Sequence, residues 1–206
     1  CIATEAIDRV HTTAQSHHRV MLIEVMGRNA GWLALEAGIA GGADIILIPE
    51  IPYDMEEIIH TARRRGQFGR RFSIVAVAEG ARPIGGAQAV QKVVEDSPDP
   101  IRLGGISHVI AAQVEEHTGI ECRVAVLGHV QRGGTPTPLD RVLATQFAVK
   151  AMELVVAGQF NHMVALRGGE MVAVPVEKVM GRQQLVPHDS PLIKTALSVG
   201  TSMGIA

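Results

Sequence analysis

The chain has 206 residues, 47% hydrophobic and 19% charged, a composition typical of a globular protein with a sizeable core. Nineteen basic residues against 21 acidic ones give a net charge of −2, which argues against nucleic acid or an anionic membrane as a partner. The longest apolar runs have about six residues, whereas a membrane span needs roughly 20. We therefore expect a protein that neither crosses a membrane nor binds nucleic acid.

Two cysteines, Cys1 and Cys122, are too few for a disulfide framework, and no C-x-x-C pair indicates zinc. A reducing, cytoplasmic location is expected. Charges at Glu5, Asp8 and Arg9 interrupt the region where a secretory signal would need an apolar core. The first residue is Cys in the middle of a helical pattern, so we expect further sequence upstream in the intact protein.

Helix-like and strand-like segments alternate along the chain as far as Leu127. Amphipathic spacing predicts helices at 3–15, 29–39, 54–66 and 106–117. Short apolar and partly β-branched runs predict buried strands at 20–25, 44–48, 72–78 and 123–127. This alternation implies parallel βαβ units, and we predict an α/β fold in which a mostly parallel sheet lies inside a Rossmann-like three-layer αβα sandwich.

The rest of the chain follows other patterns. Residues 80–105 are broken by Pro and Gly, which predicts an inserted excursion containing a short helical piece. Thr137 and the proline after it open a long helix that Gly158 ends. Segments 163–166 and 171–174 predict a hairpin.

Polar loops follow three of the predicted strands, after Val25, Ala78 and Leu127. Ligands of parallel sheets bind at the carboxyl ends of the strands. We therefore expect these three loops to meet at one site.

The first loop is Met26-Gly-Arg-Asn-Ala-Gly31. Glycine lets the backbone approach a ligand, and Arg28 offers a planar donor fork that matches phosphate. An ordinary turn with a solvated arginine explains the same residues. In the second loop Glu79 precedes a glycine; its carboxylate can accept hydrogen bonds from a sugar hydroxyl, although a surface charge or helix-dipole partner is the alternative.

The third loop, Leu127-Gly-His-Val-Gln-Arg-Gly-Gly134, is the most specific. His129 and Arg132 flank a sharp glycine turn and offer two hydrogen-bond donors for a phosphate. The alternative is that His129 is a core histidine and Arg132 a structural arginine. Arg123 adds a cation on the preceding strand, and Arg19 precedes the first strand. No dinucleotide, P-loop or nucleophile-elbow motif is found, so the sequence indicates an anion site without a visible nucleophile or general base.

These strings together resemble the 6-phosphofructokinase family over nearly the whole chain. They are Val25-Met-Gly-Arg-Asn-Ala-Gly31, Ile39-Ala-Gly-Gly42 with Ile48-Pro-Glu50, Ala76-Val-Ala-Glu79, and the third loop followed by Pro138-Leu-Asp-Arg141. The resemblance implies that residues 1–206 are the C-terminal, fructose 6-phosphate-binding region, a truncated second half of that fold. It also implies transfer of a phosphoryl group from ATP or pyrophosphate, with Mg²⁺, to the 1-hydroxyl of fructose 6-phosphate.

The resemblance further implies a role for each residue. Met26 and Gly27 would contact the sugar, and the catalytic Arg28 would steady the transferring group. Glu79 would accept a hydrogen bond from a sugar hydroxyl. The remaining cations would hold the 6-phosphate. His129 and Arg132 would do so from one subunit of a homo-oligomer, a dimer or a tetramer, and Arg19 and Arg123 from its neighbour.

Departures from the family pattern matter as well. The donor-binding glycine-rich loop and the string with the catalytic base precede this region in the family and do not occur here. The N-terminal donor-binding domain and the Mg²⁺ ligands are therefore expected upstream, and this chain alone is expected to be inactive. The long 80–105 segment is more similar to the branch with pyrophosphate-using members. Arg70 and Arg71 fit the basic side of an effector site, whereas His11 does not.

Two rival readings stay open at this level. One is a non-catalytic sensor of a sugar phosphate, and the other is a regulatory subunit that pairs with an active homologue. Arg28 argues against a sensor, because a sensor has no use for a cation placed at a transferring group.

Overall fold

The computed structural model describes residues 1–14, 19–67, 72–93 and 100–205. It divides into two compact units, one formed by Cys1–Arg132 with Gln184–Ala206 and the other by Gly133–Gln183. The first two loops that the sequence predicts to carry chemistry, and the third as far as Arg132, belong to the first unit, which also contains the parallel sheet.

The sheet of the first unit has four strands in the order β2-β3-β1-β6. The strands are β1 (Arg19–Val25), β2 (Ile45–Leu47), β3 (Phe72–Ala78) and β6 (Glu121–Val126). Every pairing in it is parallel, and the register sets Val25 at the end of β1 opposite Ala78 at the end of β3. The four predicted strands are confirmed, and the parallel pairing brings the ends of β1, β3 and β6 to one edge.

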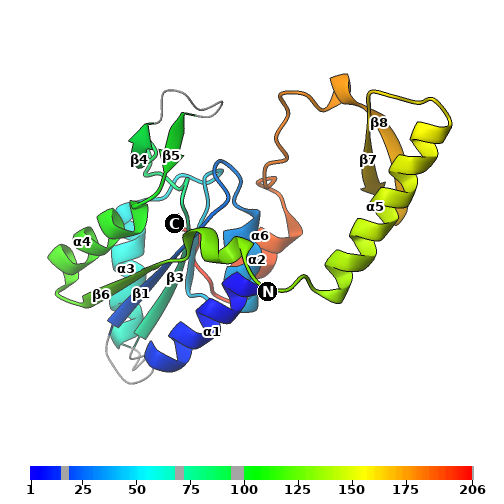
Figure 1. Cartoon of the computed structure of the whole chain (residues 1–206). Helices are drawn as coiled ribbons and strands as arrows, with labels where there is room; N and C mark the ends of the chain where they lie inside the picture. The colour runs from blue at the N-terminus through cyan, green and yellow to red at the C-terminus, as the bar shows by residue number, and fades with distance from the viewer. Residues whose placement is uncertain (15–18, 68–71, 94–99, 206) are drawn as a thin grey trace. The chain divides into compact units, whose positions relative to one another are not determined.

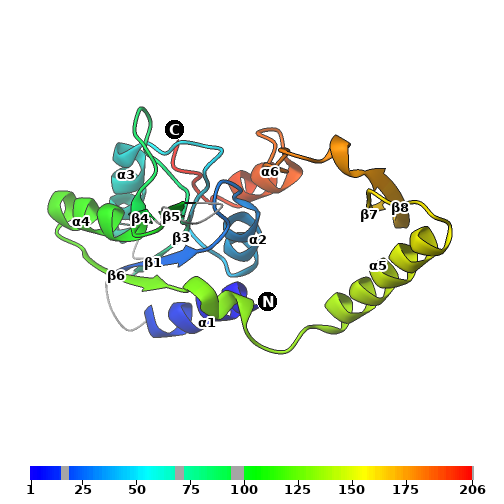
Figure 2. The same ribbon diagram turned by 45° about the horizontal axis from the view of Figure 1, so that its top comes forward.

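Helices cover both faces of this sheet (Figures 1 and 2). One face carries α1 (Ile2–Ala14), α2 (Trp32–Ala40) and α6 (Pro191–Ser198), and the other carries α3 (Met55–Gln67) and α4 (Ile106–Thr118). Side chains of β1 alternate between two cores, with Leu22 in the core beneath α3 and α4 and Ile23 in the core beneath α1 and α2. The predicted three-layer αβα sandwich is therefore confirmed.

The turn after β1 is longer than the sequence predicts. Helix α2 begins at Trp32 and not at Asn29, because the preceding residues form a turn in which the Ala30 N–H donates to the Gly27 carbonyl at 3.0 Å. Arg28 in this turn has φ 52°, a left-handed conformation that is uncommon for a residue with a side chain. Arg28 and Asn29 therefore lie in a turn at the end of the sheet and outside the helix.

The excursion between β3 and α4 contains a hairpin where the sequence predicts a short helix. Its strands are β4 (Val90–Val93) and β5 (Ile101–Leu103), which pair antiparallel with a shift in register between Val90 and Lys92. The predicted helix is wrong for these residues because β-branched residues on both strands pair across the hairpin, and such residues suit a pleated surface better than a helix.

The second unit consists of a long helix packed on a hairpin. Helix α5 (Pro138–Val156) lies against β7 (His162–Arg167) and β8 (Glu170–Pro175), and the short 3₁₀ turn η2 (Val176–Lys178) follows. Thr137 caps α5 in a capping box with Asp140, as its position before a proline predicts. The predicted helix and hairpin are both confirmed. Among the described helices of both units, none combines the length and the apolar character that crossing a membrane requires.

Candidate functional site

A pocket of about 780 Å³ lies at the carboxyl edge of the sheet. Its lining includes residues from all three loops that the sequence singles out: Met26 and Arg28 after β1, Glu79 after β3, and Gly128, His129 and Arg132 after β6. The expectation that these loops meet at one site is therefore confirmed.

Glu79 holds the first loop in place. Its Oε1 accepts the backbone N–H of Gly27 at 3.1 Å and the backbone N–H of Arg28 at 2.9 Å. The Oε2 of the same carboxylate has no hydrogen bond to any residue that the structure describes, and Glu79 is one of the residues that line the pocket. One oxygen thus positions the loop, and the other can accept a hydrogen bond from a ligand.

Gly80 explains how closely the two loops approach each other. A Cβ at this position would lie 1.9 Å from the carbonyl oxygen of Arg28, a distance that no side chain tolerates. Glycine after Glu79 is therefore required by the contact between the β3 loop and the β1 loop. Glu79 accepts the N–H of Arg28, and Gly80 lies against its carbonyl oxygen, so the left-handed backbone of Arg28 is fixed at both of its polar groups. Strained residues of this kind persist where the surroundings fix them.

His129 and Arg132 lie on one 3₁₀ helix, η1 (Gly128–Arg132), which begins directly after β6 and Leu127. Residues three apart on a 3₁₀ helix lie above one another, so the two side chains share one face. The sequence predicts that they flank a glycine turn; instead Gly128, with φ 48°, precedes both of them. The two side chains are exposed and both line the pocket, as two side chains that donate hydrogen bonds to a phosphate must.

Arg19 and Arg123 lie away from this pocket. They face each other from β1 and β6 across Glu121, whose Oε2 accepts from the Nε of Arg19 at 2.5 Å and whose Oε1 pairs with Arg123. The hydrogen bond from Arg19, followed by the charge of Arg123, lowers the pKa of Glu121. The structure therefore joins the two arginines to one carboxylate and does not bring them to the pocket of their own chain.

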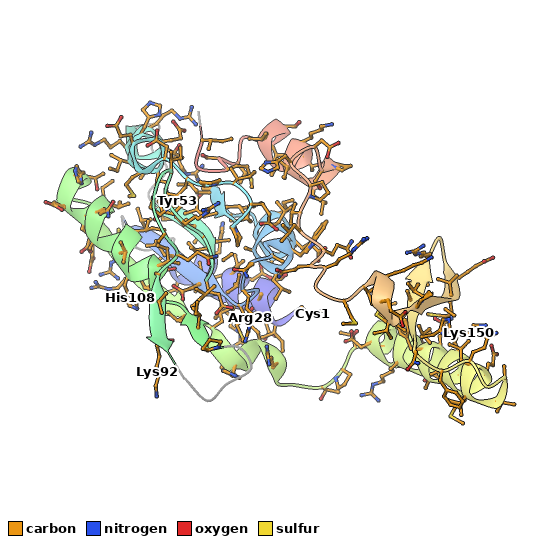
Figure 3. The ribbon with its side chains drawn as sticks, turned by 90° about the horizontal axis from the view of Figure 1, so that it is seen from above. Cys1, Arg28, Tyr53, Lys92, His108 and Lys150 are labelled. Atoms are coloured by element: carbon orange, nitrogen blue, oxygen red, sulfur yellow. The ribbon has the colours of Figure 1, made fainter. Side chains whose placement is uncertain are left out.

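Several pocket residues were missed by the sequence reasoning. They are Glu24 from β1, Gln91 and Lys92 from β4, and His108 from α4. Arg28, Lys92 and His108 are labelled in Figure 3. Glu24 carried a usable signal, because it is the one acidic residue in the apolar strand Val20-Met-Leu-Ile-Glu-Val25. The hairpin residues carried none, since their strand was read as part of a helix.

His11, which the sequence analysis also discusses, does not line the pocket. His11 packs edge-on against Phe72, with ring centroids 4.9 Å apart, so its described contact is structural. Arg70 and Arg71 lie outside the described residues.

The described part of the chain does not fit a magnesium site. Within it, no three His, Cys, Asp or Glu side chains gather closely enough to hold a metal ion. The carboxylates of the pocket, Glu24 and Glu79, already accept hydrogen bonds from backbone N–H groups. What these residues can do is bind an anion and orient a hydroxyl-bearing ligand, so no chemical step is assigned here to Mg²⁺.

Comparison with known proteins gives a consistent result. The sequence model of the family described as Phosphofructokinase matches residues 1–155. The chain is 52% identical over 205 residues to ATP-dependent 6-phosphofructokinase 2 of Clostridium perfringens, covering 98% of this chain and 55% of that protein. It is 49% identical over 189 residues to pyrophosphate–fructose 6-phosphate 1-phosphotransferase of Amycolatopsis methanolica, covering 91% of this chain and 55% of that protein.

A solved structure of phosphofructokinase from Saccharomyces cerevisiae is also similar. It superposes with a TM-score of 0.69 at 35% sequence identity, covering 85% of this chain and 22% of that chain. The present chain spans a little over half the length of the curated relatives above, 55% in both cases.

Proposed function

The chain belongs to the phosphofructokinase family, whose sequence model covers residues 1–155, and from this premise we propose that it is the fructose 6-phosphate-binding half of a 6-phosphofructokinase. The intact protein transfers a phosphoryl group to the 1-hydroxyl of fructose 6-phosphate and so forms fructose 1,6-bisphosphate. The donor is ATP or pyrophosphate, since the similar proteins named above include one of each kind.

The observation that carries this proposal is the convergence of three loops on one pocket. His129 and Arg132 provide two adjacent donors for a phosphate on η1, and Arg28 provides a third cation from the end of β1. Phosphoryl transfer depends mainly on positioning and on charge neutralisation, so cations fixed around a phosphate ester are the groups that it needs. The pocket also has the size for a phosphorylated sugar.

Each pocket residue then has a role. His129 and Arg132 hold the 6-phosphate through charge-assisted hydrogen bonds. Met26 and the backbone at Gly27 contact the sugar, while the Oε2 of Glu79 accepts a hydrogen bond from one of its hydroxyls. Arg28 lies against the phosphoryl group as it transfers and is the one catalytic residue assigned to this half.

We assign Arg19 and Arg123 to the 6-phosphate of a neighbouring subunit in a homo-oligomer, a dimer or a tetramer. Their position away from the pocket of their own chain and their partial exposure support this assignment. Two charge-assisted contacts of about 1.5–3 kcal/mol each correspond to a hundredfold or greater gain in affinity on assembly.

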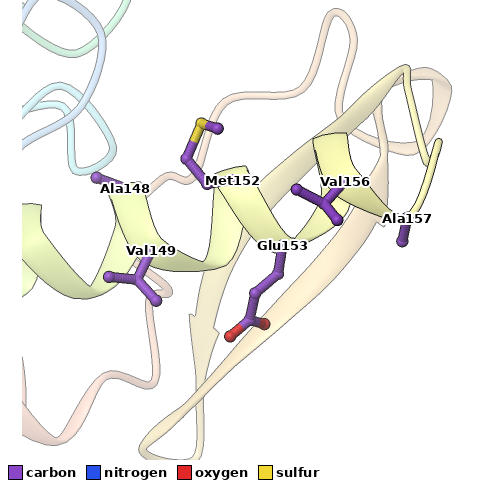
Figure 4. Close-up of a pocket in the computed structure, with 6 residues that line it drawn as sticks. All are labelled: Ala148, Val149, Met152, Glu153, Val156 and Ala157. Carbon is purple, nitrogen blue, oxygen red and sulfur yellow. The ribbon is translucent and has the colours of Figure 1, made fainter.

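Residues 1–206 form the C-terminal region in this proposal, and the donor and Mg²⁺ bind to an N-terminal half. The apolar surface of α5 supports the idea that another surface covers it in the intact protein. Val149, Met152 and Val156 are 56%, 59% and 84% exposed and line a hollow on this helix (Figure 4). Exposed apolar surface of this kind is typical of an interface, and we expect the chain alone to show no phosphotransferase turnover.

Calorimetry on the purified 206-residue chain tests the proposal. We expect fructose 6-phosphate to bind more tightly than glucose 6-phosphate, and Arg132→Ala to weaken this binding at least tenfold through the loss of one charge-assisted contact. Arg167→Ala, on the exposed end of β7 in the second unit, is the matched control and should leave binding unchanged. Equal binding of the two sugar phosphates, or equal effects of the two substitutions, would contradict the proposed site.

A further inference from the structure

Glu24 is a buried carboxylate in the wall of the anion pocket. It is 2% exposed and belongs to β1, two residues before Met26. A buried carboxylate costs free energy unless it is hydrogen-bonded, and a negative charge beside a phosphate site opposes binding. Its presence there therefore calls for a physical reason.

The carboxylate of Glu24 caps the N-terminus of α4. Its Oε1 accepts the N–H of Gly105 at 2.9 Å, and its Oε2 accepts the N–H of Ser107 at 3.0 Å. Gly105 is the N-cap residue of α4, in a left-handed conformation, and no side chain of its own satisfies the first turn. These are the N–H groups, at the positive end of a 13-residue helix, that would otherwise attract an anion from the pocket.

Without the Glu24 carboxylate, the pocket would thus have two walls that favour negative charge. Helix α4 lies on the face of the sheet shared with α3, whereas η1, with His129 and Arg132, contacts α1 of the opposite face. Glu24 reaches both walls: its side chain caps α4, and its backbone carbonyl accepts the N–H of Leu127 at 3.0 Å, directly before η1. A phosphate that entered in the reverse orientation would meet the N-terminus of α4.

We infer that Glu24 determines which end of the ligand binds where, because its carboxylate occupies the anion-attracting N-terminus of α4 and directs the phosphate to His129 and Arg132. Glu24 is a positioning residue in this inference and touches no reacting atom. The inference deepens the proposed function and rests on it, since it explains why a phosphorylated sugar binds in one orientation.

The chain supplies a matched control. Glu50 also caps a helix, α2, although its two oxygens share one N–H, that of the N-cap residue Gly31, at 3.0 and 3.1 Å, and Oε1 also accepts that of Val186 at 2.8 Å. Glu50 does not line the pocket. Glu50→Gln and Glu24→Gln therefore each remove one charge from a capped helix, but they differ in whether the carboxylate lines the pocket.

The test is a titration of the 206-residue chain with inorganic phosphate, followed through the backbone amide resonances of Gly105, Ser107 and η1. In the wild type we expect phosphate to shift the amides of His129–Arg132 and to leave Gly105 and Ser107 unmoved. In Glu24→Gln we expect Gly105 and Ser107 to respond as well, with an apparent affinity roughly threefold to tenfold higher than in Glu50→Gln.

The outcomes separate this inference from the proposed function. Phosphate-dependent shifts of Gly105 and Ser107 in the wild type would overturn the inference without any variant, so it stays testable even where Glu24→Gln fails to fold. Identical responses of the two variants would overturn it as well. Silence of the η1 amides alone would count against the proposed phosphate site, while the response of Gly105 and Ser107 still decides the role of Glu24.

Discussion

The carboxylate of Glu79, at the end of β3, fixes the backbone of Arg28, at the end of β1, through a hydrogen bond of 2.9 Å. The two residues are far apart in sequence, and the parallel register of β1 with β3 brings them together. The arginine with the left-handed backbone is thus held by a residue at the end of a neighbouring strand as well as by the turn of its own loop.

Glu79→Ala should release this loop. Two hydrogen bonds to a charged acceptor are lost, each worth about 1.5–3 kcal/mol, and binding of fructose 6-phosphate should weaken by tenfold or more. Calorimetry measures the affinity, and amide hydrogen exchange at Gly27 and Arg28 should accelerate in parallel. Glu57→Ala on α3 removes a carboxylate that bonds to Thr61 outside the pocket, and it should leave both readouts unchanged. Unaltered exchange at Arg28 in Glu79→Ala would rule out this account of the loop.

Gly80→Ala should displace the same loop from the other side. Its Cβ would meet the Arg28 carbonyl oxygen at 1.9 Å, so the backbone of one loop must move. We expect the affinity for fructose 6-phosphate to fall by tenfold or more, because the backbone of the first loop would be displaced from its position in the pocket. Gly42→Ala is the comparison: it introduces strain at φ 68° in open space outside the pocket, so it should lower the melting temperature with affinity retained.

The two cysteines should differ sharply in reactivity. Cys1 is exposed, whereas burial, followed by the charges of Glu115 and Glu121, raises the pKa of Cys122 to about 12 from 9.0. The thiolate is the reactive form, so near neutral pH the raised pKa alone should make Cys122 react about a thousandfold more slowly than an ordinary thiol. Poor access of the reagent to the buried sulfur should slow the reaction further. A thiol reagent applied to the native chain should label one cysteine quickly and the second only on unfolding. Rapid labelling of both in the folded chain would contradict the structure around Cys122.

Glu121 should contribute a pH-dependent stability. Its pKa is lowered in the folded chain, chiefly by the hydrogen bond from Arg19, so its contribution is present above the ordinary value of 4.5 and is lost as the pH falls through the lowered folded value. Chemical unfolding of Glu121→Gln should therefore show a deficit relative to the wild type at pH 7 that shrinks toward zero in acid. Because the side chain of Glu121 is 39% exposed, added salt should also reduce the deficit. A deficit that is constant from neutral to acid pH would indicate a packing effect instead.

Much of this architecture was predictable from local pattern. Apolar runs predict β1 and β3, and the rule for parallel sheets places Arg28, Glu79 and His129 at one edge, where they line one pocket. These predictions succeeded because each depends on a short segment and on the single assumption of parallel pairing. Which residues lie side by side at the ends of neighbouring parallel strands then follows from the topology.

The parts that were not predictable depend on partners distant in the chain. Val90 in β4 reads as helical until its pairing with Leu103 is known. The role of Glu24 requires the N-terminus of α4, formed by residues far downstream. Asn29 was expected at the start of a helix, and the left-handed turn at Arg28 before it becomes intelligible only with Glu79 and Gly80 in place.

The all-parallel pairing of the central sheet has a consequence for synthesis on the ribosome. Arg19 of β1 pairs with Phe72 on one side and with Glu121 on the other, so the middle strand emerges long before its second neighbour exists. Contacts between such distant segments form slowly because loop closure must precede them. Until β6 has been translated, the nascent chain presents an unpaired apolar strand edge, which is a template for aggregation. We therefore expect the interval between completion of β3 and of β6 to be the stage at which a growing chain most needs a chaperone.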